Sequence, residues 1–125
     1  MGVLRIEPTQ EMPEIFLDSY NSTLNFSGVS RPENVFDLYN TIMDWIEESS
    51  CDFKKEIICN FSFRYINTSS KKMIFEILRE LHKISFDANI PLNVNWTYRK
   101  IDEDILELGE EFEELIDHKF NYIVN

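Results

Sequence analysis

Residues 56–98 read EIICNFSFRYINTSSKKMIFEILRELHKISFDANIPLNVNWTY, and this stretch decides the fold. Residues 56–66 are rich in β-branched and aromatic side chains, which alternate between an apolar and a mixed face as in a central strand. Residues 69–86 carry apolar side chains at helical spacing, and residues 92–98 again read as a strand. A strand, a crossover helix and a second strand predict a right-handed βαβ unit with parallel strands.

Three short strands are predicted before this unit. Residues 3–7 form the first, and residues 14–20 and 23–27 read as a β-hairpin with its turn at residues 21–22. Gly28 is expected to end the hairpin's second strand, because glycine is disfavoured within strands.

A helix is predicted to follow, because Ser30 and Glu33 form a capping-box pattern with Pro32 in the first turn. Its apolar positions cover roughly half of the helix circumference, which is wider than the stripe needed to face one core. The helix is therefore either sunk deeply against the sheet or leaves one margin available for a partner. The two candidate margins are Leu38 with Trp45, and Phe36 with Met43.

Residues 101–116 predict a third helix, whose narrow apolar stripe is surrounded by acidic residues up to Asp117 without any Lys or Arg among them. We interpret this acidic run as a solvated face that is compatible with a basic partner surface.

Residues 119–124 predict a last strand. The order of elements predicts one α/β domain over residues 1–125, with a mixed sheet of about five or six strands and helices mainly on one face.

The composition excludes several classes of function. The chain has 12 Lys and Arg against 23 Asp and Glu, and its net charge of −11 disfavours binding to nucleic acid. Its apolar runs are only a few residues long, so no segment is expected to span a membrane, and no secretory signal is visible. Cys51 and Cys59 are expected to be reduced thiols rather than a disulfide or a metal site. These features predict a cytoplasmic protein.

The sequence predicts no enzyme, no metal site and no cofactor. Its three glycines do not form a phosphate-binding loop, and His82 and His118 are expected to be solvated surface histidines without a nucleophile beside them. The acids of the third helix are too many and too alike to resemble a tuned acid–base pair. A small hydrolase that uses this acidic helix with a metal ion is the alternative from a different class.

Residues 67–72, Asn-Thr-Ser-Ser-Lys-Lys, carry three hydroxyls where the central strand turns into a helix. Asn67 or Thr68 is expected to cap the helix by accepting a backbone N–H bond, but one cap needs only one residue. The surplus hydroxyls suggest a site of phosphorylation. A phosphate would add about −1.5 to −2 charges beside the positive helix end, near Lys71 and Lys72.

Three motifs resemble a known family when taken together. They are YINTSSKKM at residues 65–73, GVSRPEN at residues 28–34 and DEDILELGEE at residues 102–111, and residues 7–18 resemble the opening strands of the same family. In this order and combination the sequence resembles the SiaC family of bacterial regulatory phosphoproteins, over nearly the whole chain.

The resemblance implies a fold similar to the STAS domains of anti-sigma factor antagonists, and a role as a partner switch. It implies that a Ser/Thr kinase of the histidine-kinase-like type phosphorylates Thr68, with Ser69 and Ser70 as alternates, and that a metal-dependent protein phosphatase removes the phosphate. It further implies that the unphosphorylated form binds an effector such as a diguanylate cyclase, which raises cyclic di-GMP and favours biofilm formation.

Partner contacts are expected at the start of the second helix and along the side of this helix that faces away from its core stripe. The predicted contact residues are Asn67, Lys71, Lys72, Phe75, Arg79 and His82. A constitutive protein-binding module of the anti-sigma factor antagonist type, in which residues 67–70 only cap a helix, is the alternative function.

Overall fold

The computed structural model describes residues 2–125, which form six strands and three α-helices in one sheet-and-helix domain. The strands are β1 (Val3–Ile6), β2 (Glu14–Asp18), β3 (Thr23–Ser30), β4 (Ile57–Ile66), β5 (Leu92–Tyr98) and β6 (Asn121–Val124). The helices are α1 (Val35–Ser49), α2 (Thr68–Ala88) and α3 (Glu103–Ile116), and a 3₁₀ turn, η1 (Ser50–Asp52), follows α1.

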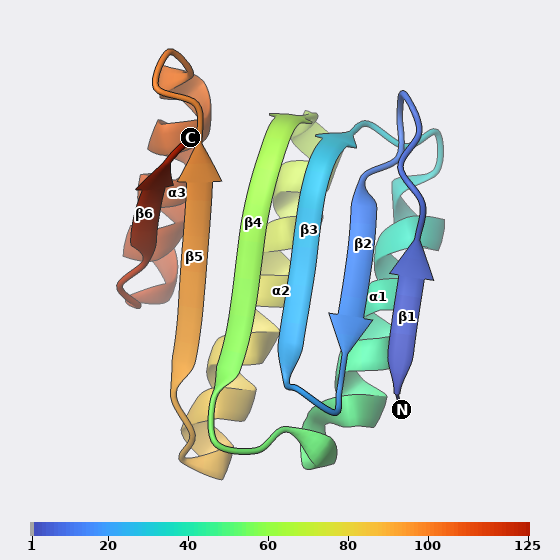
Figure 1. Ribbon diagram of the computed structural model, residues 1–125, viewed down its shortest axis with the longest axis vertical. Helices are drawn as coiled ribbons and strands as arrows, with labels where there is room; N and C mark the ends of the chain where they lie inside the picture. Colours follow the sequence, from blue (N-terminus) through green and yellow to red (C-terminus); the bar gives the residue numbers. More distant parts are fainter. Residues whose placement is uncertain (1) are drawn as a thin grey trace.

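The strands lie in the order β1-β2-β3-β4-β5-β6. The pairs β1–β2 and β2–β3 are antiparallel, whereas β3–β4, β4–β5 and β5–β6 are parallel. The helices α1, α2 and α3 connect the parallel strands and lie behind one face of the sheet (Figure 1). The predicted mixed sheet with helices on one face, and the central parallel βαβ unit, are therefore confirmed.

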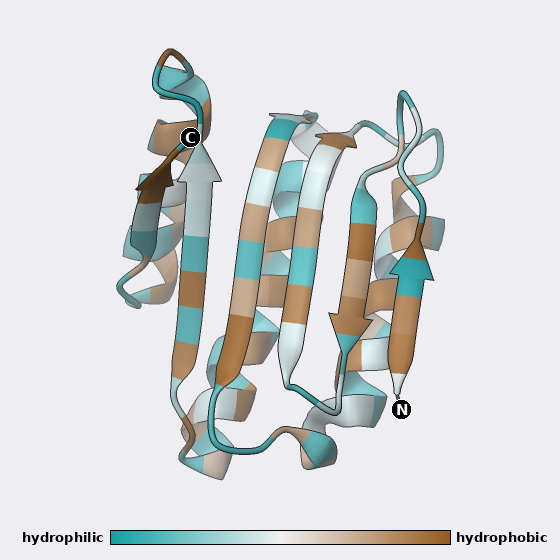
Figure 2. Cartoon of the chain, in the orientation of Figure 1, coloured by the Kyte–Doolittle hydropathy of each residue, from teal (hydrophilic) through white to brown (hydrophobic). Residues whose placement is uncertain are grey.

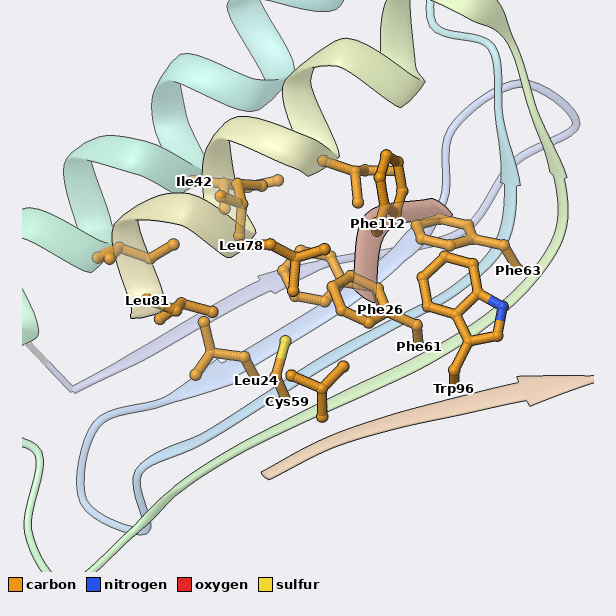
Figure 3. Close-up of a cluster of buried hydrophobic side chains, with 14 of the residues drawn as sticks. Leu24, Phe26, Ile42, Cys59, Phe61, Phe63, Leu78, Leu81, Trp96 and Phe112 are labelled. Atoms are coloured by element: carbon orange, nitrogen blue, oxygen red, sulfur yellow. The ribbon is translucent and has the colours of Figure 1, made fainter. Parts of the chain in front are cut away.

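The core lies between the sheet and the helices. Along β3, β4 and β5, apolar and polar residues alternate, and the apolar ones face the helices (Figures 2 and 3). Phe61 stands at the centre, with its ring centroid 5.0 Å from that of Phe26 and 5.3 Å from that of Trp96. The thiol of Cys59 is buried in the same core, which raises its pKa and keeps it neutral, and Cys51 is an exposed free thiol.

Helix α3 crosses directly over the indole of Trp96. The indole Nε1 donates to the carbonyl oxygen of Ile105 at 2.9 Å, and a Cβ placed on Gly109 would lie 2.6 Å from that same nitrogen. Real Cβ atoms do not approach other atoms this closely. Gly109 is therefore required for the close approach of α3 to β5.

Substituting Gly109 by Ala is expected to destabilise the domain. Helix propensity alone would make Ala stabilising by about 1 kcal/mol, but the clash with Trp96 reverses the sign and gives a net loss of about 1–3 kcal/mol. Urea unfolding measures the change, with Glu110→Ala on the solvent side of the same helix as the control. A Gly109→Ala variant as stable as the wild type would contradict this packing.

The opposite face of the sheet carries a row of hydrogen-bonded asparagines. Asn121 donates to Asn95 at 3.1 Å, Asn95 to Asn60 at 2.8 Å, and Asn60 to Asn25 at 2.8 Å. These bonds run across β6, β5, β4 and β3 between side chains in register. The polar groups of this face therefore satisfy one another, and the face needs no covering layer.

The prediction for the start of α1 was wrong. Ser30 is the last residue of β3 and is buried, and α1 is capped instead by Asn34, whose side chain accepts from the backbone N–H of Asp37 at 3.2 Å. Gly28 does not end the strand. It has a positive φ of 90° and adjoins a register shift, so β3 passes through a bulge and continues to Ser30.

The packing of α1 decides between the two margins. Leu38 and Trp45 are buried, whereas Phe36 is 62% exposed and Met43 is half-buried. The margin that stays accessible is thus the one formed by Phe36 and Met43.

The expectation of two solvated histidines was also wrong. His82 and His118 are both half-buried and meet edge to face, with their ring centroids 5.3 Å apart. The Nε2 atom of His118 lies 2.7 Å from the carbonyl oxygen of Leu92. The two histidines therefore help to join α2 to the segment between α3 and β6.

Candidate functional site

The corner between β4 and α2 lies at the carboxyl edge of the parallel strands. Asn67 has an extended backbone, and its side-chain Oδ1 accepts from the backbone N–H of Ser70 at 2.9 Å. Its own N–H donates to the carbonyl oxygen of Ser30 at 2.9 Å, which joins the corner to the end of β3. Of the two predicted caps, Asn67 is the one that the structure shows.

Thr68 is the first residue of α2 and is exposed, and so is Ser69. Because Asn67 supplies the cap, the hydroxyl of Thr68 is not needed to hold the helix start. The hydroxyl of Ser69 lies 3.4 Å from Oδ1 of Asn67, at the long limit of a hydrogen bond. Both hydroxyls can therefore be reached by another protein while the domain stays folded.

Ser70 faces the other way and has no exposed surface. Its Oγ accepts a 2.9 Å hydrogen bond from the hydroxyl of Ser30, which in turn lies 2.7 Å from the hydroxyl of Tyr39 on α1. A kinase cannot reach such a hydroxyl in the folded chain, so its burial contradicts the prediction of Ser70 as an alternate acceptor.

The hydroxyls of Ser30, Tyr39 and Ser70 form a buried network that joins β3, α1 and α2. Burial raises the pKa of Tyr39 to about 12, although its hydrogen bonds with Ser30 and Ser70 act in the opposite direction. The phenol is thus neutral at physiological pH and serves as a hydrogen-bonding group. The network fixes the first turn of α2 against the rest of the domain.

Replacing Tyr39 by Phe is expected to lower the free energy of unfolding by about 1–2 kcal/mol, because it removes one hydrogen bond and leaves Ser30 with one partner fewer. Urea unfolding measures the loss. Tyr20→Phe is the matched control, since Tyr20 is 82% exposed and its substitution is expected to change stability by less than about 0.5 kcal/mol. Equal stability of the two variants would show that the network does not stabilise the fold.

Positive charge surrounds the corner. Lys71 and Lys72 are exposed in the first two turns of α2, whose first turn holds no acidic residue. The guanidinium of Arg31, which follows β3, lies 5.8 Å from the ring centroid of Tyr65 near the end of β4. Together with the positive end of the helix dipole, these cations make the corner favourable for a negatively charged group.

The remaining predicted contact residues continue along α2, but the structure does not gather all of them into one exposed site. Arg79 is exposed, and its guanidinium lies 3.4 Å from Glu76 and 5.8 Å from the centroid of the Phe75 ring. Phe75 is half-buried, with its ring 6.1 Å from that of Phe112 on α3, and His82 contacts His118. Phe75 and His82 therefore hold α2 against its neighbours as well as bordering the surface.

A cavity of about 540 Å³ opens on the helical layer around Arg79 and His82. Met43 of α1 and Leu115 of α3 line it, and Leu115 is largely exposed although it lies in the apolar stripe of its helix. These two residues were not predicted as contacts. Their apolar character was visible in the sequence, but only the packing of the three helices shows that they border the same groove.

The acidic helix α3 forms no metal centre in the structure. Within residues 2–125, no group of three or more His, Cys, Asp or Glu side chains is placed to hold a metal ion. Asp102 caps α3 by accepting from the N–H of Ile105 at 3.1 Å. Within residues 2–125, no helix is long and apolar enough to cross a membrane.

The fold and the corner together define a small α/β domain, which presents an accessible hydroxyl at a capped helix start. The sequence pattern described as "SiaC family regulatory phosphoprotein" matches residues 6–125. The chain therefore belongs to the SiaC family.

The known relatives agree with this assignment. An uncharacterized protein of Pseudomonas aeruginosa strain UCBPP-PA14 is 33% identical over 114 residues, which are 91% of this chain and 90% of that protein. SiaC of P. aeruginosa, in a crystal structure of the diguanylate cyclase SiaD with its activator SiaC, superposes with a TM-score of 0.88 at 31% identity, covering 98% of this chain and 99% of that one. The structure of apo-SiaC gives a TM-score of 0.82 at 32% identity, covering 100% and 99%.

Proposed function

We propose that this chain is a non-catalytic partner switch of the bacterial cytoplasm, controlled by phosphorylation of Thr68. The unphosphorylated form binds an effector protein, and the phosphorylated form releases it. The observation that carries this proposal is the division of roles at the corner. Asn67 caps α2, so the exposed hydroxyl of Thr68 can take up a phosphate without loss of a structural hydrogen bond.

The electrostatics of the corner support the same division. A phosphate carries about −1.5 to −2 charges at neutral pH and is favoured at a helix N-terminus. Lys71 and Lys72 are within the next turn, so the modified domain stays folded while this part of its surface changes sign. A partner that docks against these cations then meets repulsion and a desolvation cost. Ser69, which is exposed beside Thr68, is the remaining alternate acceptor.

We propose a diguanylate cyclase as the effector, because SiaC of P. aeruginosa is described as the activator of the diguanylate cyclase SiaD in their complex. The docking surface consists of Asn67, Lys71, Lys72, Phe75, Arg79 and His82, extended by Met43 and Leu115 at the groove between the helices. Thr68 and Lys72 lie on the same side of α2 as Arg79, since residues three or four apart share a helix face. Phosphorylation at Thr68 thus acts at one end of this surface.

The proposed regulators are a Ser/Thr kinase and a metal-dependent protein phosphatase of the same bacterium. We expect that incubation with the cognate kinase and ATP adds the mass of one phosphate, and that the cognate phosphatase with its metal removes it. Intact-mass spectrometry measures both steps. Thr68→Ala abolishes the gain, whereas Thr41→Ala, at an exposed threonine of α1, leaves it unchanged. A gain that survives Thr68→Ala would place the acceptor elsewhere.

The substitution Thr68→Asp separates the switch from a defect in folding. An acidic residue in the first helical turn stabilises the helix by about 0.3–1 kcal/mol, so the melting temperature is expected to stay equal or rise. Binding to the effector is expected to weaken by about tenfold, corresponding to roughly 1.4 kcal/mol. Thermal unfolding measures the first quantity, and calorimetry with the full-length cyclase measures the second.

Thr68→Ala is the matched variant for this comparison, and it is expected to bind the effector like the wild type. Equal affinity of the Ala and Asp variants would favour the alternative, a constitutive binding module of the anti-sigma factor antagonist type. A lower melting temperature of the Asp variant would show that the corner cannot accept negative charge.

A further inference from the structure

The strands β4 and β5 separate toward their carboxyl ends. Their paired register ends at Phe61 and Trp96, but β4 continues to Ile66 and β5 to Tyr98 (Figure 1). On their outer sides, β4 stays paired with β3 as far as Ile66, and β5 stays paired with β6 as far as Tyr98. Residues 62–66 of β4 and residues 97–98 of β5 thus diverge, and we call the space between them the fork.

A cavity of about 330 Å³ lies over this fork and extends to Ser27 and Gly28 of β3 and to Asn125 after β6. Its wall includes Ser62 and Arg64 from β4, and Thr97, Tyr98 and Arg99 from β5 and the residue after it. Ser62 and Arg64 point away from the helices, because the residues that alternate with them face the core. The cavity therefore opens on the face of the sheet that carries the asparagine row, whereas α2 and the proposed docking surface lie on the other face.

The walls of the fork supply hydrogen-bond donors and positive charge from both sides. Arg64 on β4 and Arg99 after β5 line the cavity from opposite sides, and Ser62 and Thr97 line it as well. Alternate residues of a parallel strand direct their backbone N–H groups to one neighbour, so part of the inner edge of β4 beyond Phe61 also faces the gap. A chain with a net charge of −11 thus places two guanidinium groups around one small cavity.

Two acidic side chains lie near the fork and limit what it can bind. Asp102 has its Oδ2 atom 3.9 Å from Nη2 of Arg99, and Glu14 already accepts the hydroxyl of Ser27 at 3.2 Å. The contact to Arg99 is long, so its guanidinium keeps donors for another acceptor. The two carboxylates offset the formal charge of the two arginines, so the fork offers guanidinium and hydroxyl donors to an anion rather than an excess of positive charge.

We propose that the fork between β4 and β5 binds the phosphate group of a small phosphorylated molecule. A carboxylate has two oxygens, which one guanidinium can satisfy in a bidentate pair. The fork offers two guanidinium groups and two hydroxyls from opposite walls, which match the three terminal oxygens of a phosphate monoester. This site goes beyond the partner switch, since it lies on the other face of the sheet and does not require modification of Thr68.

The test is a titration followed by backbone amide NMR, in a phosphate-free buffer at pH 7.5 and constant ionic strength set with sodium chloride. The probes are inorganic phosphate and glycerol 3-phosphate, with sodium acetate as the carboxylate arm. We expect saturable shifts confined to residues 62–64 and 97–99 with either phosphate probe, and weaker binding of acetate. Equal affinity for acetate, shifts spread over all basic residues, or no saturation would overturn the proposal.

Variants assign the binding to the fork. Arg64→Gln with Arg99→Gln is expected to weaken phosphate binding by about tenfold or more, because two charge-assisted contacts are lost. Lys83→Gln with Lys119→Gln removes the same charge from exposed positions elsewhere and is expected to leave the affinity unchanged. Ser62→Ala, which alters no charge, is expected to weaken binding by a smaller factor. Unchanged affinity in the arginine variant, with its fold intact by circular dichroism, would contradict the proposal, whatever the effector assays show for Thr68.

Discussion

The hydrogen bond from the backbone N–H of Ser70 to the side chain of Asn67 is the constraint on which the rest of the corner depends. It satisfies one of the N–H groups that every helix leaves open at its start, and it does so from the residue directly after β4. Because this cap comes from Asn67, the next residue can point to solvent. Ser70 can turn inward at the same time, where it joins Ser30 and Tyr39 in a buried network. Because Asn67 supplies the cap, the hydroxyl of Thr68 is accessible, whereas the hydroxyl of Ser70, two residues later, is buried and structural.

The one-sided arrangement of the helices gives the domain two faces with different properties. On the helical side, apolar side chains are buried between layers, and the surface of α2 is the one that we propose for contacts with other proteins. On the open side, the hydrogen bonds from Asn121 through Asn95 and Asn60 to Asn25 satisfy the polar groups across four strands. Apolar docking is disfavoured on such a surface, because it would remove water from amides that gain no new partner. The open face is therefore suited to binding small polar groups, and the helical face to binding proteins.

Much of the fold follows from local sequence, and the failures have a common physical cause. The alternation in residues 56–66 and the helical spacing after Thr68 are local patterns, and the structure confirms the strands, the helix and the parallel pairing that they predict. The capping box predicted at Ser30 was wrong, and Ser70, named as an alternate acceptor, is buried, because these two serines bond to each other across 40 residues of sequence. The bulge at Gly28 carries β3 on to Ser30, and a strand end at Ser30 can only be recognised once β4 is beside it. The contact between His82 and His118 likewise needs the packing of α2 on the end of α3.

The distribution of charge explains how so acidic a chain keeps the helix start at Thr68 free of carboxylates and close to basic residues. Each parallel strand that precedes a helix brings an arginine to its carboxyl end, with Arg31 after β3, Arg64 near the end of β4 and Arg99 after β5. Lys71, Lys72 and Lys100 lie at the same edge, and the first turn of α2 holds no acidic residue, whereas Asp37 lies in the first turn of α1 and Glu103 and Asp104 in that of α3. Charges at the surface act over about 8–10 Å at physiological ionic strength, so a ligand at this edge is governed by its near neighbours more than by the net charge. A dianion at Thr68 therefore lies beside Lys71 and Lys72 and meets no carboxylate in its own helical turn. The position of the hydroxyl at this edge, more than its chemical identity, is therefore what makes it suited to a switch.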